Sequence, residues 1–311
     1  MRMHVACSCA SDGVYAPHSA AMLHSVLSHA GGLEVRVHYL HGPGFPAASR
    51  RGLESMVSEH GGSIEFLAIA DEQVAGLPTL EWERVPSSLW YRIFLPELLP
   101  GIDRVLYLDA DTIATDSLKP LWETQLGDHY LGAVTNVFMR EHEGRAERLG
   151  LAGPGAYFNS GVMLLNLELW RRDALSGAVR DYALTNRERL GWADQDTMNI
   201  LLGRRRLALH PRWNLMNSIV DFAWSAEVFG DEIVEQARRD PGIRHFEGPG
   251  ANKPWHYLCP PERRALYLAH RRMTPWPELE LEGATPRNRI RRLLRGARGR
   301  LAGRGAAAVS A

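Results

Sequence analysis

The sequence has few cysteines, no excess of charge of either sign and no long apolar run. Cys7, Cys9 and Cys259 are the three cysteines among 311 residues, so a disulfide framework is excluded and a reducing compartment is expected. Cys7 and Cys9 have no second Cys or His pair at metal-ligand spacing, and we interpret them as buried, inert thiols. Lys+Arg and Asp+Glu both number 36, and this balance disfavours a nucleic-acid-binding protein.

The N-terminus also lacks the features of an export signal. Met1 to His4 lead into a short apolar run without a small-residue cleavage site. Nowhere is there an uncharged stretch of about 18 residues, the length that a membrane-spanning helix needs. We therefore expect the protein to be made and kept in the cytoplasm.

Strand and helix patterns alternate along the chain. Apolar runs bounded by turn residues predict strands at 4–10, 34–40 and 63–67, with helices at 15–29 and 50–60 between them. This order is typical of a doubly wound, Rossmann-like nucleotide-binding sheet. Further strands are expected at 105–108, 130–134 and 162–166, and further helices at 89–99, 192–202 and 231–239. We predict an α/β fold with one domain over residues 1–285.

Residues 286–311 form a separate basic tail. The segment from Arg287 to Arg304 mixes arginines with apolar residues. Such a segment can bind the anionic inner face of a membrane, at about 1 kcal/mol per basic residue. A disordered, solvated tail is the alternative, and the sequence leaves both interpretations open.

Asp109-Ala110-Asp111 directly follows the apolar strand expected at 105–108. In open α/β sheets ligands bind at the carboxyl ends of the strands. Two carboxylates one residue apart suit a hard divalent ion such as Mg²⁺ or Mn²⁺, which can in turn bind a diphosphate. Alternatively, both aspartates form a solvated turn. A third interpretation is the nucleophile motif of haloacid-dehalogenase-type phosphatases, with Asp109 phosphorylated, but that motif usually lies near the N-terminus.

A second candidate segment runs from Arg244 to His256 and contains a Gly/Pro loop. The imidazole of His245 could complete the ligand shell of the ion, which would favour Mn²⁺ over Mg²⁺. The ammonium group of Lys253 could hold phosphate charge. Alone, this segment would be weak evidence for a metal site.

Taken in order, these segments resemble glycosyltransferase family 8, the retaining enzymes of the glycogenin and lipopolysaccharide galactosyltransferase type. The resemblance runs from about Val5 to Trp255. The matching segments are Ala10-Ser11-Asp12 with Tyr15, Tyr91-Arg92, Tyr107 to Thr112, Leu118 to Trp122, Tyr157 to Val162, Asp194-Gln195-Asp196, and His245 to Trp255.

The resemblance implies a GT-A-type fold and a role for each matching position. Asp109, Asp111 and His245 would bind Mn²⁺, with Mg²⁺ as the alternative. The uracil of a UDP-sugar would contact Ala10, Asp12 and Tyr15. The transferred sugar would be surrounded by Arg92, Asn159, Ser160 and Asp194, and the diphosphate would be held by Gly248 and Lys253, with Ala110 also at the donor. Asp194 and Gln195 are the catalytic candidates, with Gln195 near the anomeric carbon.

The implied reaction is transfer of glucose or galactose from a UDP-sugar to a saccharide or glycolipid acceptor, with retention. A catalytically inactive UDP-sugar-binding protein is the alternative. The segment from His245 to Lys253 is two residues longer than the family pattern, which puts the reach of Lys253 in doubt. Asn136 stands where the galactosyltransferase has an acceptor-site aspartate, and Val14 replaces a common polar residue. We expect the acceptor to meet loops within 140–155 and 219–240.

Overall fold

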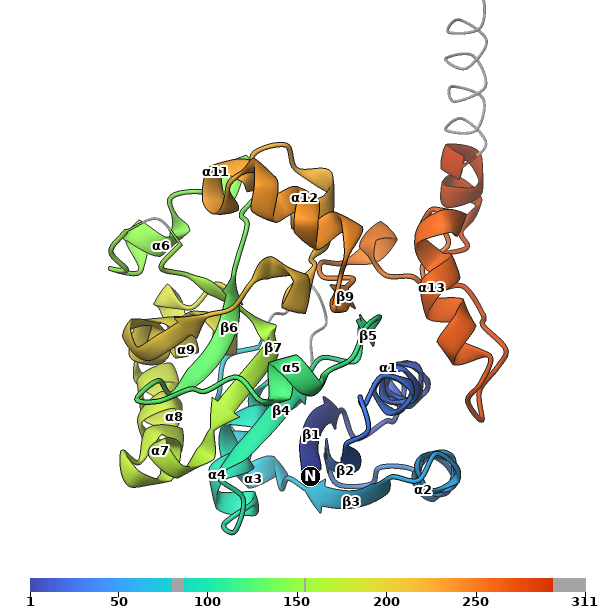
Figure 1. Cartoon of the computed structure of the whole chain (residues 1–311), viewed down its shortest axis with the longest axis horizontal. Coiled ribbons are helices and arrows are strands. Elements are labelled where there is room, and N and C mark those ends of the chain that lie inside the picture. Colours follow the sequence, from blue (N-terminus) through green and yellow to red (C-terminus); the bar gives the residue numbers. More distant parts are fainter. Residues whose placement is uncertain (80–86, 154, 293–311) are drawn as a thin grey trace, which may run out of the picture.

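The computed structural model describes residues 1–79, 87–153 and 155–292. A mixed seven-stranded sheet with helices on both faces forms the body of the protein (Figure 1). The strand order is β3-β2-β1-β4-β7-β6-β8. The strands are β1 Arg2–Cys9, β2 Glu34–His41, β3 Ser63–Ala68, β4 Arg104–Leu108, β6 Leu131–Thr135, β7 Phe158–Asn166 and β8 Arg206–Ala208. A separate two-stranded sheet joins β5 Thr112–Ala114 to β9 Ile243–His245.

Helices and 3₁₀ turns connect these strands. The α-helices are α1 Ala16–Ser28, α2 Ala47–Glu59, α3 Asp71–Val74, α4 Leu95–Leu98, α5 Lys119–Trp122, α6 Arg145–Arg148, α7 Leu167–Arg172, α8 Leu175–Thr185, α9 Ala193–Leu202, α10 Asn217–Asp221, α11 Ser225–Phe229, α12 Asp231–Arg239 and α13 Pro261–Arg271. The 3₁₀ segments are η2 Ser87–Phe94, η3 Arg140–His142, η4 Arg187–Arg189, η5 Gly203–Arg205, η6 Pro211–Asn214 and η7 Gly250–Asn252.

The direction of the strands changes at the centre of the sheet. β1 pairs in parallel with β2 and with β4, whereas β7 runs antiparallel to both β4 and β6. The carboxyl ends of β1 and β4 therefore meet the amino end of β7 at one edge of the sheet. The Asp109 N–H donates to the Gly161 carbonyl (2.8 Å), which ties the end of β4 to β7 at this edge.

Side chains of successive strand residues enter opposite cores, as the two-residue period of a strand requires. On β4, Leu106 and Leu108 pack in a core with α1 and α2, while Val105 and Tyr107 pack in a core with α7, α8 and α9. Both faces of the strand are apolar because both are covered. A smaller cluster of Ile113, Phe246, Trp255 and Tyr267 joins β5 and α13 to this body.

The predicted α/β fold and its Rossmann-like order are confirmed, with two corrections. Residues 89–99, expected as one helix, form the 3₁₀ segment η2 followed by the single turn α4. Pro96 lacks the N–H that an α-helix would donate to the Arg92 carbonyl, so a continuous α-helix is interrupted there. The strand expected at 162–166 begins at Phe158, so Asn159 and Ser160 are buried strand residues.

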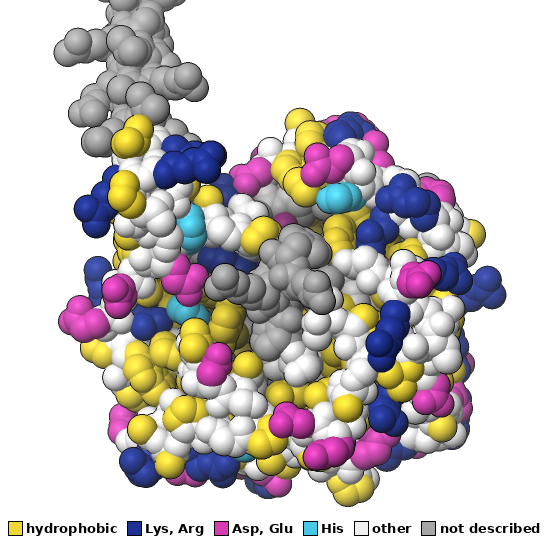
Figure 2. All heavy atoms as spheres, turned by 180° about the vertical axis from the view of Figure 1, so that it is seen from behind, with side chains coloured by type: hydrophobic (Ala, Val, Ile, Leu, Met, Phe, Trp, Pro, Cys, Tyr) yellow, Lys and Arg dark blue, Asp and Glu magenta, His cyan; other side chains and the backbone are white. Residues whose placement is uncertain are grey.

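Two further expectations concern the termini and the cysteines. None of the helices within the described residues is long and apolar enough to cross a membrane. Residues 286–292 are helical and carry exposed arginines, and Figure 2 shows basic side chains gathered where the chain leaves the body. The remainder of the predicted basic tail, from residue 293, lies outside the described residues.

Cys7 and Cys9 are free and buried, and burial raises the pKa of Cys9 to about 11, as expected of inert thiols.

Candidate active site

The two aspartates of the Asp-Ala-Asp segment are carried into the site by a strand end and a following turn. Asp109 leaves β4, and its carbonyl accepts hydrogen bonds from the backbone N–H (3.1 Å) and the hydroxyl (2.8 Å) of Thr112. These bonds fix the turn and leave the side chains of Asp109 and Asp111 directed into a cavity at the edge of the sheet. The aspartates thus lie in a turn, but Asp111 is buried, so this is not the solvated turn of the alternative interpretation, and both side chains line a cavity.

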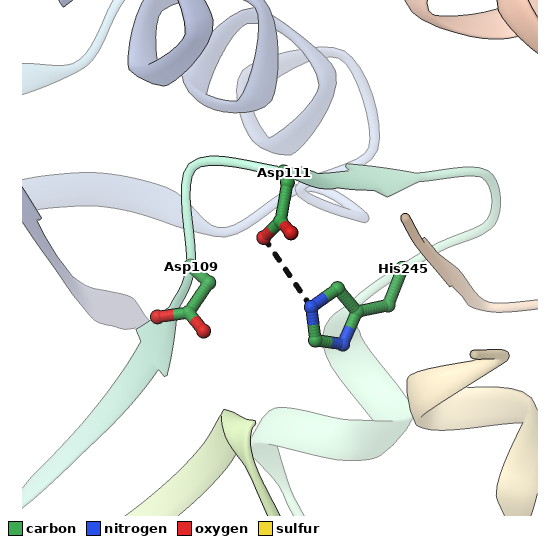
Figure 3. A group of neighbouring side chains, drawn as sticks. All are labelled: Asp109, Asp111 and His245. Atoms are coloured by element: carbon green, nitrogen blue, oxygen red, sulfur yellow. Dashed lines mark ion pairs between the residues drawn. The ribbon is translucent and has the colours of Figure 1, made fainter. Parts of the chain in front are cut away.

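Pairing of β5 with β9 brings His245 to the same place from far along the chain. Thr112 is the register partner of His245, and the Phe246 N–H donates to the Asp111 carbonyl (2.9 Å). One ligand atom from each of Asp109, Asp111 and His245 lies within 4.8 Å of the others. Figure 3 shows the three side chains facing one common space. This group could hold a metal ion.

The imidazole of His245 is oriented by Asn214. The Asn214 side-chain N–H donates to Asn159 Oδ1 (2.9 Å), which leaves Asn214 Oδ1 as the acceptor for His245 Nδ1 (2.8 Å). Nε2 of His245 then faces Asp111 Oδ1 at 3.3 Å. A ring nitrogen that donates to a fixed oxygen, with the other nitrogen turned toward carboxylates, is the arrangement that metal-binding histidines adopt. Two carboxylate oxygens and one imidazole nitrogen fit a divalent cation such as Mn²⁺.

Gly161 forms the floor beneath these three side chains. A Cβ atom at this position would lie 2.4 Å from Cε1 of His245 and 2.8 Å from Oδ2 of Asp109. Only a residue without a side chain allows the strand β7 to approach the group this closely.

The charges of the site compensate one another. Burial raises the pKa of Asp111, but Lys253 and His245 lower it more, so the pKa of this carboxyl group lies far below its usual range. Burial lowers the pKa of His245, and the Asp111 carboxylate outweighs this and raises it above the ordinary value. Lys253 Nζ contacts Asp111 Oδ2 directly. The longer loop therefore does bring Lys253 to the site.

The extra length of this loop is taken up locally. Residues Gly250–Asn252 form the 3₁₀ turn η7, closed by a hydrogen bond from the Lys253 N–H to the Gly250 carbonyl (3.0 Å). Gly248 and Gly250 have positive φ angles of +85° and +57°, which glycine adopts without strain. The insertion is a turn that leaves the side chain of Lys253 beside Asp111.

Arg92 connects the metal-ligand candidates to the neighbouring helix. Its buried guanidinium donates to Asp109 Oδ1 (3.0 Å) and to the Ser160 carbonyl (2.7 Å), and its Nε lies 3.4 Å from Asp194 Oδ2. Burial raises the pKa of Asp194 to about 7, with Arg92 acting in the opposite direction. Within the described residues, Asp194 Oδ2 is a buried oxygen without a hydrogen-bond partner.

Gln195 is held by its neighbours on the other side of this pocket. Its Oε1 accepts from the Ser160 N–H (2.9 Å) and hydroxyl (3.1 Å), and its side-chain N–H donates to the Tyr157 hydroxyl (3.3 Å). The bonds fix the amide in one orientation along the wall of the cavity.

Two adjoining cavities contain almost all the predicted site residues. One, of about 350 Å³, is lined by Ala10, Tyr15, Arg92, Asp109, Ala110, Asp111, Gly248 and Lys253. The other, of about 690 Å³, is lined by Arg92, Asp109, Asp111, Asn159, Ser160, Asp194, Gln195, His245, Gly248 and Lys253. Asp12 lines neither, because its carboxylate accepts from the Val14 N–H (3.1 Å) and closes the preceding turn.

Several lining residues were not predicted from the sequence. Trp255 and Glu282 contribute to the smaller cavity, and Phe138, Trp192 and Phe222 to the larger one. Trp255 ends the family-like segment from His245 to Trp255, so its place in the site could have been predicted from the sequence. Nothing local to Asn214 or Glu282 distinguishes them from other polar residues, and only their tertiary neighbours do.

Comparison with known proteins agrees with this geometry. A sequence profile described as "Glycosyl transferase family 8" matches residues 6–259. The chain is 28% identical to General stress protein A of Bacillus subtilis (strain 168) over 280 residues, covering 88% of this chain and 94% of that protein. It is 25% identical over 257 residues to lipopolysaccharide 1,3-galactosyltransferase of Salmonella typhimurium, covering 79% of this chain and 72% of that enzyme.

The fold is similar to that of a solved galactosyltransferase, LgtC, determined with donor and acceptor sugar analogues. The TM-score is 0.77 at 28% identity, with 88% of this chain and 96% of that chain covered. The family match over residues 6–259 includes Asp109, Asp111 and His245, and it favours a glycosyltransferase over the phosphatase interpretation of Asp109. The chain belongs to glycosyl transferase family 8.

Proposed function

We propose that this protein is a retaining hexosyltransferase that uses Mn²⁺, takes glucose or galactose from a UDP-sugar and transfers it to a saccharide or lipopolysaccharide-type acceptor. The observation that carries the proposal is the convergence of Asp109, Asp111 and His245 at the junction of two cavities. Donor and acceptor need separate spaces that meet at the reacting carbon, and a diphosphate leaving group needs positive charge between them.

The charged residues of the junction divide the work of binding the donor. A divalent cation held by the two carboxylates and the imidazole would neutralise charge on the leaving diphosphate. Lys253 contacts Asp111 and lies within reach of the same phosphate oxygens once that contact is exchanged. Arg92 bonds to Asp109 and to the Ser160 carbonyl, and it thereby orients the pocket for the transferred sugar.

Asp194 and Gln195 are placed to bind the transferred sugar. Oδ2 of Asp194 accepts no hydrogen bond from the described residues, and a sugar hydroxyl would supply the hydrogen bond that this buried oxygen lacks. Gln195 Oε1 already accepts two bonds from Ser160, which suits a positioning role at the anomeric carbon better than a lasting covalent bond. This arrangement favours a front-face route in which the leaving phosphate accepts the proton of the acceptor hydroxyl.

The larger cavity is proposed as the acceptor site. Its outer wall includes Phe138, Trp192 and Phe222, aromatic surfaces that suit the apolar faces of sugar rings. The two loops expected to meet the acceptor supply Glu141, His142, Asp221 and Phe222. Arg140 of the first loop donates to Glu227 of the second (2.7 Å) and so holds the two loops together.

The proposal is tested by measuring UDP release from a panel of UDP-sugars by the purified protein. Release from one donor should stop in EDTA, return on addition of Mn²⁺, and fall by at least about 100-fold in Asp111→Asn, because both cation and diphosphate lose their anchor. Asp116→Asn is a matched control, since Asp116 lies outside both cavities. UDP binding without release from any donor, with acceptor saccharides present, would favour the inactive UDP-sugar-binding protein.

We infer a cytoplasmic protein that contacts the inner face of a membrane through the basic segment Arg287 to Arg304, of which only residues 287–292 are described. Exposed arginines in the described part support this contact.

A further inference from the structure

The smaller cavity has a wall that comes from beyond the family-matched segment. The family profile ends at residue 259, yet Glu282 lines this cavity together with Tyr15, Lys253 and Trp255. Glu282 follows α13, whose Tyr267 hydroxyl bonds to Nδ1 of His18 on α1 (2.6 Å). Figure 1 shows α13 beside α1, so the C-terminal part of the fold closes one side of the donor cavity.

The backbone of Glu282 is held firmly against the loop that carries Lys253. The Glu282 N–H donates to the Trp255 carbonyl (3.0 Å), and the Tyr257 N–H donates to the Glu282 carbonyl (2.8 Å). The next residue, Gly283, has a φ angle of +69°, and a Cβ atom there would lie 2.4 Å from Nε2 of His256. These contacts specify one position for the residue, although its side chain is exposed.

The carboxylate of Glu282 has no partner that would explain its placement. Among the described residues, it takes part in no side-chain hydrogen bond or ion pair. Burial raises the pKa of Glu282, while Lys253 acts in the other direction, so the group is partly desolvated and lies in the field of the phosphate-binding lysine. A partly desolvated acceptor that faces a cavity is completed by a ligand that donates hydrogen bonds.

The neighbours of Glu282 indicate which part of a nucleotide it faces. Trp255 stands between Tyr15, whose ring it meets edge to face at 5.8 Å, and Lys253, whose Nζ lies 5.9 Å from its ring centre. In the proposed function Tyr15 contacts the base and Lys253 the diphosphate, and both line this cavity. The ribose joins the base to the diphosphate, so it falls beside Trp255 and beside Glu282, whose backbone N–H is bonded to the Trp255 carbonyl.

We propose that Glu282 is a donor-specificity residue whose carboxylate accepts hydrogen bonds from the ribose hydroxyls of the nucleotide-sugar. The proposal rests on the proposed function, since it takes the smaller cavity to be the nucleotide site. A carboxylate that accepts from a ribose 2′-hydroxyl is also the solution that dinucleotide-binding sheets use. Here the carboxylate comes from a segment that packs onto the sheet after the last helix.

The test is a pair of binding measurements by titration calorimetry in the presence of Mn²⁺. UDP and 2′,3′-dideoxy-UDP are titrated into the full-length wild type, Glu282→Ala, Glu282→Gln and the control Glu280→Ala. Glu280 is exposed on the same segment but does not line the cavity. We expect Glu282→Ala to weaken UDP binding by about tenfold and Glu282→Gln by less, because charge-assisted hydrogen bonds are the stronger ones. Binding of the dideoxy nucleotide should not change.

Three results would overturn the proposal. If Glu282→Ala weakens both nucleotides equally, the residue supports the cavity wall and does not contact the ribose. If it tightens both, the carboxylate only repels the diphosphate. If UDP affinity is unchanged, it faces solvent. In all three the wild type still binds UDP, whereas a folded wild type that binds no UDP would overturn the proposed function itself.

Discussion

Gly161→Ala is the substitution that tests the metal-ligand group most directly, because it adds one carbon where three side chains meet. The new Cβ would lie 2.4 Å from Cε1 and 3.1 Å from Nε2 of His245, and 2.8 Å from Oδ2 of Asp109. Distances under 3 Å between such atoms cannot be accommodated without movement. His245 is 2% exposed and bonded to Asn214, and the Gly161 backbone is bonded to Asp109 and Asn159, so neither side moves freely.

The displacement needed is close to 1 Å, since ordinary contacts lie near 3.4 Å or beyond. A shift of about 1 Å at a catalytic centre costs about 100-fold in rate. We therefore expect UDP release to fall by about 100-fold and Mn²⁺ affinity to fall with it. Overpacking at a buried site should also lower the free energy of unfolding by about 1–3 kcal/mol.

Mn²⁺ affinity by electron paramagnetic resonance, UDP release and thermal unfolding are measured on the same preparation. The matched control is Gly177→Ala on α8, where nothing lies within 4 Å of the added Cβ and alanine is the better helix former. Circular dichroism at the assay temperature separates lost ligand geometry from unfolding. If the folded Gly161→Ala protein kept the metal affinity and UDP release of the wild type, the role given to Gly161 beneath the three metal-ligand candidates would be wrong.

Two further predictions concern residues around the site. Asn214→Ala removes the acceptor of His245 Nδ1 and should weaken Mn²⁺ binding by about 10- to 100-fold, measured by calorimetry; unchanged affinity would mean that packing alone orients the ring. Burial lowers the pKa of His18 to about 3, below the value of about 6.5 in the unfolded chain. Between these values the unfolded chain binds more protons, so this residue makes the free energy of unfolding fall as the pH falls below 6.5. The free energy of unfolding is measured with urea at pH 7 and pH 5. Its decrease from pH 7 to pH 5 should be smaller in His18→Gln than in the wild type, by about 1 kcal/mol per pH unit. An equal decrease in both proteins would contradict the lowered pKa of His18.

Local patterns were sufficient for the strands, most helices and the order of the site segments. An apolar strand that runs into Asp109 and Asp111 is visible in a few consecutive residues, because the strand period and the turn residues act over short range. Pro96 shows the limit of such reasoning. Its effect on the helix was readable in principle, but the helical spacing of the flanking apolar residues concealed the 3₁₀ geometry.

The composition of the site was decided by contacts between distant parts of the chain. His245 reaches Asp111 because β9 pairs with β5, and Asn214 orients it from a 3₁₀ turn that no motif marks. Asp12 belongs to a family motif, yet its carboxylate closes a turn and does not line the cavities.

The sequence by itself determined the fold class, the family segments and the identity of the metal-ligand candidates, since each depends on neighbours within a few residues. The tertiary structure decided how the longer loop brings Lys253 to the site and which oxygen of Asp194 accepts no hydrogen bond from the described residues. It also decided that Glu282 reaches the smaller cavity from beyond the matched segment. These features depend on packing between elements far apart in the chain. Their free energy comes from burial and from hydrogen bonds formed only when the whole fold is assembled.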